Sequence, residues 1–85
     1  MLKSKILIGV IGQGYVGLPL SIEFGKKLNV IGFDLNSQRI YELNKKKDRN
    51  NDIKLKEFKL SKKVFFTDNI SKLSECNVYI ITVPT

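Results

Sequence analysis

A glycine-rich segment near the N-terminus has the residue types and spacing that hold a phosphate group. The segment Gly12-Gln13-Gly14-Tyr15-Val16-Gly17 matches the pattern G-x-G-x-x-G. It directly follows the apolar run 6–11 and precedes a helical pattern, and this context gives the short motif its meaning. Gly12 allows a tight turn, Gly14 lets the backbone approach a pyrophosphate, and Gly17 lets the helix pack closely against the sheet.

Main-chain donors at the start of the helix complete this predicted phosphate site. The free N–H groups near Tyr15 and Val16 would face the phosphate oxygens, with the positive end of the helix dipole behind them. The alternative is a glycine-rich turn that binds no ligand. The strand–loop–helix context favours a dinucleotide site.

An acidic residue ends the second predicted strand. Asp34 lies about 20 residues after Gly12, the spacing at which a carboxylate accepts hydrogen bonds from the adenosine ribose hydroxyls of NAD. Its charge would repel the 2′-phosphate of NADP. Arg39 instead favours NADP, because a guanidinium can pair with that phosphate. We predict NAD, with Arg39 on the adenine or a ribose hydroxyl; the alternative for Asp34 is a helix cap.

The fourth predicted strand ends in Thr82-Val83-Pro84-Thr85. In open α/β sheets, ligands bind at the carboxyl ends of the strands, where the strand order reverses. We therefore add Val83 and Thr85 to the predicted cofactor site, with Thr85 near the inner half of the cofactor. A turn residue after proline is the alternative for Thr85.

The elements that position these residues alternate along the chain. Apolar and β-branched runs predict strands at 5–11, 29–34, 64–67 and 78–82. Helical patterns lie at 15–27, 36–44 and 70–75, with a short amphipathic turn or helix near 53–60 and a polar loop at 45–51. In the first helix, the predicted packed stripe is Val16, Leu20, Phe24 and Leu28, with Ile22 beside it. This order predicts an α/β Rossmann-like parallel sheet with strand order 3-2-1-4 and flanking helices.

Composition narrows the chemistry further. The chain has 85 residues, a single cysteine and no histidine, so neither an intramolecular disulfide nor a structural zinc site is expected. We interpret Cys76 as a buried thiol because no histidine is present to activate it. The apolar runs are much shorter than the ~18 residues of a membrane span. We expect no secretory signal, no membrane association and a cytoplasmic location.

Positive charge is concentrated in the middle of the chain. The net charge is +7, and the segment 39–63 holds ten Lys and Arg against four Asp and Glu. Such a segment is typical either of a solvated surface or of a polyanion site. Aromatic residues do not alternate with the lysines in a stacking pattern, so nucleic acid is the less favoured partner.

The complete set of motifs resembles the N-terminus of the UDP-glucose/GDP-mannose 6-dehydrogenase family. The matching residues are Gly12-Gln13-Gly14-Tyr15-Val16-Gly17-Leu18-Pro19-Leu20, Gly32-Phe33-Asp34, Asn36, Arg39-Ile40 and Val83-Pro84-Thr85. The segment from Glu23 to Asp34 is most similar to the branch that oxidises UDP-N-acetylglucosamine or UDP-N-acetylgalactosamine.

This resemblance implies an NAD-dependent oxidation of a sugar C6 alcohol to a uronate, for bacterial surface polysaccharides. It implies cofactor contacts for Val16, Asp34, Arg39 and Thr85. Residues 1–85 are then the N-terminal part of a Rossmann NAD-binding domain, without catalytic residues, and we expect them to be inactive alone. The free edge of the fourth strand would favour self-association.

The sequence leaves two alternative functions open. One is another Rossmann dehydrogenase, of the 3-hydroxyacyl-CoA or 6-phosphogluconate type, which can share the glycine motif and the acidic residue. The other is a basic module that binds nucleic acid.

Overall fold

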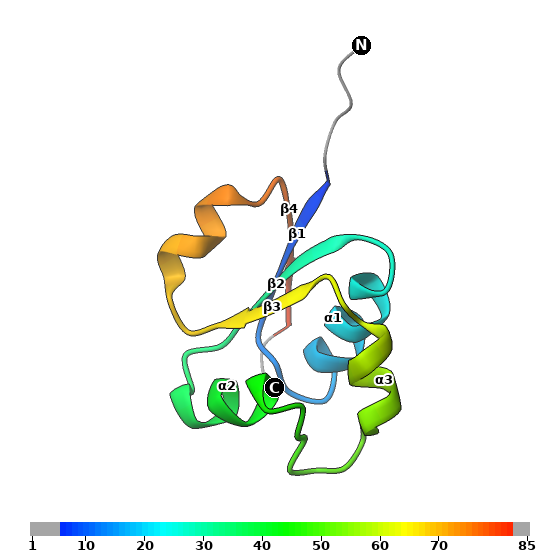
Figure 1. Ribbon diagram of the computed structural model, residues 1–85. Coiled ribbons are helices and arrows are strands. Elements are labelled where there is room, and N and C mark those ends of the chain that lie inside the picture. The colour runs from blue at the N-terminus through cyan, green and yellow to red at the C-terminus, as the bar shows by residue number, and fades with distance from the viewer. Residues whose placement is uncertain (1–5, 83–85) are drawn as a thin grey trace.

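The computed structural model describes residues 6–82 of the chain (Figure 1). Its elements are β1 (Leu7–Ile11), α1 (Gly17–Gly25), β2 (Asn29–Phe33), α2 (Ser37–Asn44), α3 (Leu55–Leu60), β3 (Val64–Thr67), the 3₁₀ helix η1 (Ile70–Glu75) and β4 (Val78–Ile81). The predicted elements are all present, and none of their bounds differs from the prediction by more than two residues. The amphipathic segment near 53–60 is a short helix, and the segment 70–75 is a 3₁₀ helix.

The four strands form one parallel sheet in the order β3-β2-β1-β4, as the sequence predicted. In register, Ile8 of β1 lies between Val30 of β2 and Val78 of β4. Parallel neighbours need crossover connections, and the helices between the strands supply them. The strand order reverses beside β1, which places the ends of β1 and β4 next to each other.

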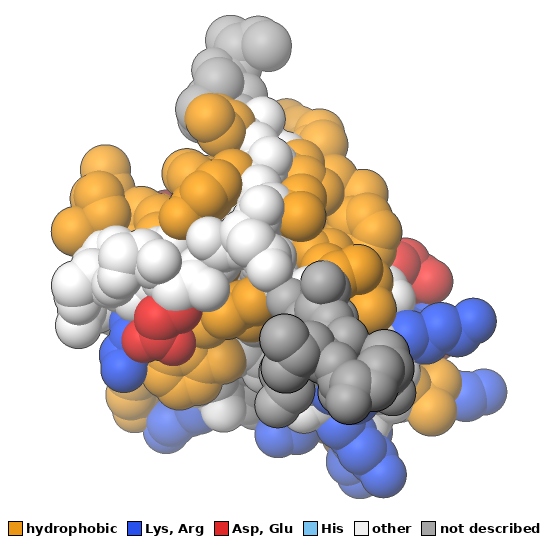
Figure 2. All heavy atoms as spheres, turned by 90° about the horizontal axis from the view of Figure 1, so that it is seen from above, with side chains coloured by type: hydrophobic (Ala, Val, Ile, Leu, Met, Phe, Trp, Pro, Cys, Tyr) orange, Lys and Arg blue, Asp and Glu red, His pale blue; other side chains and the backbone are white. Residues whose placement is uncertain are grey.

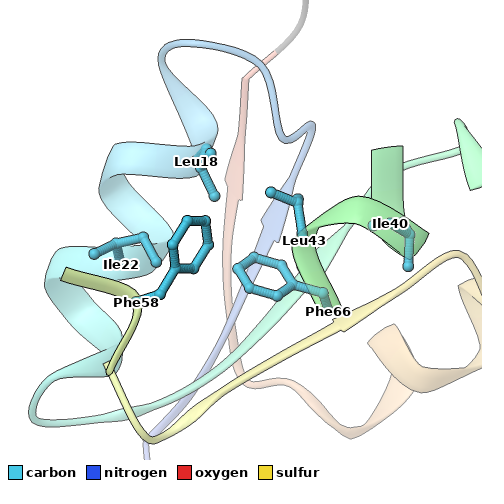
Figure 3. Close-up of a cluster of buried hydrophobic side chains, with 6 residues drawn as sticks. All are labelled: Leu18, Ile22, Ile40, Leu43, Phe58 and Phe66. Atoms are coloured by element: carbon cyan, nitrogen blue, oxygen red, sulfur yellow. The ribbon is translucent and has the colours of Figure 1, made fainter. Parts of the chain in front are cut away.

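The two faces of the sheet are covered differently. One face packs against α1, α2 and α3 (Figure 3), through a cluster of Leu18, Ile22, Ile40, Leu43, Phe58 and Phe66. Ile31 and Phe33 alternate with Val30 and Gly32 along β2, so they face the other side. There they contact Leu73 and Cys76 from η1 and the residue that follows it. Cys76 is buried, and burial raises the pKa of its thiol.

The packed stripe predicted for the first helix is wrong in part. The apolar side chains that α1 buries most deeply are Leu18 and Ile22, whereas Val16 is 61% exposed. Leu20, Phe24 and Leu28 are only partly buried. The reason is a tertiary contact: Phe58 of α3 covers Leu18 and Ile22, and the spacing of apolar residues within one helix does not reveal which side a distant helix will cover.

Apolar side chains are exposed around β4. Tyr79 and Ile81 lie at the surface, and among residues 6–82 no strand pairs with the outer edge of β4. In Figure 2, hydrophobic side chains gather over much of the visible surface, and the Lys and Arg side chains lie along the lower rim. None of the helices within residues 6–82 has the length and apolarity that crossing a bilayer requires.

Two leucines test which contacts hold the core together. Leu43 is 1% exposed and lies in the cluster of Figure 3, whereas Leu35 is 81% exposed. Leu43→Ala should lower the free energy of unfolding by about 2–5 kcal/mol, because it leaves a cavity. Leu35→Ala, the same chemical change at the surface, should alter it by less than about 0.5 kcal/mol. Urea denaturation of both purified variants measures the difference, and equal losses would contradict the assigned core.

Candidate functional site

The chain makes a tight turn where β1 ends. Gly12 has a φ of 101°, a conformation that favours glycine, and its N–H donates to the Phe33 carbonyl at 2.8 Å. The backbone that follows β4 lies very close to this turn. A Cβ on Gly12 would lie 1.9 Å from the Thr82 carbonyl oxygen. The Thr82 hydroxyl lies 2.9 Å from the Gly12 carbonyl oxygen and 3.1 Å from that of Ile11, within donating distance of both.

The other two glycines of the motif have opposite surroundings. A Cβ on Gly17 would lie 1.7 Å from the Gly12 carbonyl oxygen and 2.5 Å from the Thr82 hydroxyl. Gly17 therefore allows a close approach, as predicted, and its contacts are the loop itself and the end of β4. A Cβ on Gly14 would meet no atom within 4 Å, so this residue faces open space.

The start of α1 leaves main-chain donors unpaired. Val16 is the N-cap and makes no side-chain cap hydrogen bond, while the Leu18 N–H already bonds the Gly14 carbonyl. No residue in the described part of the chain accepts a hydrogen bond from the N–H of Tyr15 or Val16. These donors, with the helix dipole, suit an anion beside Gly14.

The peptide groups of Gln13 are held on both sides by charged side chains. Its N–H donates to Oδ2 of Asp34 at 2.7 Å, and its carbonyl accepts from Nε of Arg39 at 2.8 Å. The other oxygen of Asp34 accepts the N–H of Asn36 at 2.9 Å. Asp34 is not the cap of α2, because the side chain of Asn36 caps that helix by accepting the Arg39 N–H.

Arg39 is itself held by a buried acid. Its NH1 lies 2.8 Å from Oδ1 of Asp48, and the Asp48 side chain is only 1% exposed. Burial alone would raise the pKa of Asp48. The hydrogen bonds from Arg39 and from the N–H groups of Asn50, Ile53 and Asp52 outweigh burial, and they hold this pKa below its ordinary value. Asp48 is therefore ionised at neutral pH.

These residues surround a cleft of about 430 Å³ at the carboxyl ends of the strands. Its walls contain seven of the predicted cofactor residues: Gly12, Gly14, Tyr15, Val16, Gly17, Asp34 and Arg39. They also contain Gln13, Asn36, Arg49, Asn50 and Thr82. The predicted contacts of Val83 and Thr85 lie outside the described residues.

Sequence reasoning missed several of these residues. Gln13 occupies a variable position of the motif, yet its side chain is fully buried and donates to the Val10 carbonyl. Asp48 stands in a lysine-rich loop that looked uniformly solvated, and no local pattern marks it as buried. Thr82 had a usable signal, because it directly follows a strand at the edge where ligands bind.

Comparison with known proteins agrees with this geometry. Residues 6–85 match the model of the UDP-glucose/GDP-mannose dehydrogenase family, NAD binding domain. The chain belongs to this family. Its NAD-binding domain identifies NAD as the cofactor, which confirms the prediction from Asp34 over the NADP alternative.

The chain is similar to several individual members of this family. It is 49% identical over 82 residues to the UDP-N-acetyl-D-glucosamine 6-dehydrogenases of Salmonella typhi and Pseudomonas aeruginosa. Each match covers 96% of this chain and 19% of the relative, so the chain spans about a fifth of their length. The solved UDP-D-ManNAc dehydrogenase of Pyrococcus horikoshii is 35% identical, with a TM-score of 0.75 over 92% of this chain and 20% of that one.

The cleft fits a dinucleotide. The open space beside Gly14 and the unpaired N–H groups of Tyr15 and Val16 suit a pyrophosphate. Each carboxylate oxygen of Asp34 accepts one hydrogen bond, from the N–H of Gln13 or of Asn36. Because a carboxylate oxygen accepts about two hydrogen bonds, each retains capacity for one ribose hydroxyl.

Alanine substitutions at Gly17 and Gly14 distinguish the glycine that the close backbone approach requires from the glycine that faces open space. Gly17→Ala should lower the free energy of unfolding by about 1–3 kcal/mol, because the new methyl group collides with backbone that cannot move freely. Gly14→Ala adds the same methyl group in open space and should change stability by less than about 1 kcal/mol. Denaturation curves of the two variants decide this, and a tolerant Gly17 would contradict the close approach.

Proposed function

We propose that this chain supplies the NAD-binding portion of an enzyme that oxidises the C6 alcohol of a UDP-sugar to a uronate. The observation that carries the proposal is the cleft in which the open glycine loop and Asp34 meet. Membership of the family supports the dehydrogenase chemistry, because the relatives are named UDP-sugar dehydrogenases. It also favours this reading over the hydroxyacyl-CoA and phosphogluconate dehydrogenases, and over a nucleic-acid-binding module.

Each wall of the cleft has a separate role in this proposal. The main-chain donors of Tyr15 and Val16 bind the pyrophosphate, and Gly14 leaves room for it. Asp34 binds the adenosine ribose, and Arg39 borders the adenosine half of the cleft. Val83 and Thr85, which lie outside the described residues, are proposed as further cofactor contacts, Thr85 near the nicotinamide. When bound, NAD supplies the hydride acceptor.

The reacting groups for the sugar are proposed to come from outside residues 1–85. Cys76 packs against Ile31, Phe33 and Leu73 on the face opposite α1, and its pKa is raised, so it is unsuited to act as a nucleophile. Because the chain spans about a fifth of the length of these relatives, we propose that residues 1–85 form the N-terminal part of a Rossmann NAD-binding domain and are inactive alone. The enzyme would work in the cytoplasm and supply acidic sugars for surface polysaccharides.

The substrate class is proposed from the relatives. Two of them at 49% identity are named UDP-N-acetyl-D-glucosamine 6-dehydrogenases. A UDP-N-acetylhexosamine is therefore the substrate that we propose. The exposed outer edge of β4 is the proposed pairing site for further strands or for a second copy of the chain.

Cofactor reduction tests the proposed reaction directly. The complete gene product, mixed with NAD and UDP-N-acetylglucosamine, should form two NADH for each sugar, because conversion of an alcohol to a carboxylate removes four electrons. Residues 1–85 alone should form none. Absorbance at the NADH band with a sugar-uronate assay gives the ratio. A complete gene product that oxidises no UDP-sugar, or sustained turnover by residues 1–85, would contradict the proposal.

Asp34 provides a second test, at the level of binding. Losing hydrogen bonds to a charged group costs about 1.5–3 kcal/mol, so Asp34→Ala should weaken NAD binding roughly 10- to 150-fold. The affinity for NADP should fall much less, because the repulsion of the 2′-phosphate disappears. Asp68→Ala, a change at an exposed acid outside the cleft, is the matched control. Calorimetry with both cofactors measures the ratio, and an unchanged NAD:NADP preference would show that Asp34 does not contact the ribose.

A further inference from the structure

Both arginines that line the cleft are paired with carboxylates. Arg39 contacts the buried Asp48 at 2.8 Å, and Arg49 makes two hydrogen bonds to Glu42, at 3.0 and 2.8 Å. The chain has a net charge of +7, so free cations are abundant in its sequence. Their charge is nevertheless neutralised where the cleft would hold the adenosine half of a dinucleotide.

The pair of Arg39 and Asp48 is the stronger of the two. The exposed fractions of these side chains are 9% and 1%, so solvent screens their attraction poorly. The pair of Arg49 and Glu42 is more exposed, with side-chain fractions of 51% and 23%, and solvent weakens it. Asp48 is therefore the acid with the larger effect on the charge of the cleft.

Asp48 has no capacity left to bind a ligand itself. Oδ1 accepts from Arg39 and from the N–H of Asn50, and Oδ2 accepts from the N–H groups of Asp52 and Ile53. Four hydrogen bonds fill the acceptor sites of a carboxylate. Asp48 therefore cannot act on a ligand by a direct hydrogen bond, and its effect on binding comes from its charge, from its pairing with Arg39 or from the loop that it orders.

A free guanidinium at the position of Arg39 would attract a second phosphate on the adenosine ribose. In this structure its Nε is engaged by the Gln13 carbonyl, one NH1 hydrogen is engaged by Asp48, and its charge is cancelled. We propose that Asp48 is a positioning and specificity-determining residue, which neutralises Arg39 so that the cleft rejects a 2′-phosphate. This proposal rests on the proposed cofactor site, and it adds a second means of discrimination to the direct repulsion by Asp34.

A charge cycle on the two residues tests the proposal in the complete gene product. The measured quantity is the ratio of the dissociation constants for NAD and NADP. Asp48→Asn leaves Arg39 without its counter-charge, so the ratio should shift toward NADP binding by about 5-fold. This is the effect expected of one partly screened positive charge near the 2′-phosphate. Arg39→Gln leaves a negative charge behind and should shift it toward NAD. The double variant restores neutrality and should return the ratio to within about 2-fold of the wild type.

The ratio separates specificity from mere stability, because a loosened loop weakens both cofactors alike. Asp52→Asn removes the same charge from the same loop at an exposed position, and it should leave the ratio within about 2-fold. If Asp48→Asn folds poorly, the expected ratios for Arg39→Gln and the double variant still differ, because only Arg39→Gln should shift the ratio toward NAD. Unchanged ratios in the soluble variants, or equal losses of NADP binding in Arg39→Gln and the double variant, would overturn the role of Asp48. A wild type that binds no NAD would instead refute the proposed cofactor site.

Discussion

Three segments of backbone meet at the carboxyl end of β1, at distances that leave no room for a Cβ. The turn at Gly12, the start of α1 at Gly17 and the chain beyond β4 at Thr82 are in contact there. This approach depends on glycine at two positions, since any side chain would push α1 away from β1 and β4. The unpaired N–H groups of the loop lie next to this junction, so the contact that builds the fold also shapes the proposed anion site.

The loop is then held in place by polar contacts. Asp34 and Arg39 engage opposite sides of the residue Gln13, and Asp48 engages Arg39. Buried charges are costly unless they are paired and hydrogen-bonded, and Asp48 satisfies both conditions. The loop of residues 48–53 is thereby coupled to the glycine loop, although the two are far apart in the sequence.

The distribution of charge follows from the same contacts. Most of the lysines lie at the surface between α2 and β3, where solvent screens them. The arginines beside the cleft are each paired with an acid. A strongly basic chain can in this way surround the proposed adenosine site with nearly neutral groups apart from Asp34, the residue proposed to bind an unmodified ribose.

Much of the fold and the outline of the site followed from the sequence, because those features are set by local chemistry. Alternating strands and helices allow few arrangements, and a glycine motif between a strand and a helix has one common use. Asp34 could be placed because it ends a strand. The buried face of α1 was predicted only in part, since Phe58 reaches it from a helix more than thirty residues away along the chain. The burial of Asp48 could not be predicted for a related reason. A charged residue in a polar loop is expected to be solvated unless a tertiary partner such as Arg39 stabilises its burial. Local residue types thus determined the strands, the loop and the cofactor class, while long-range packing decided which acid holds Arg39 and how close Thr82 comes to the glycines.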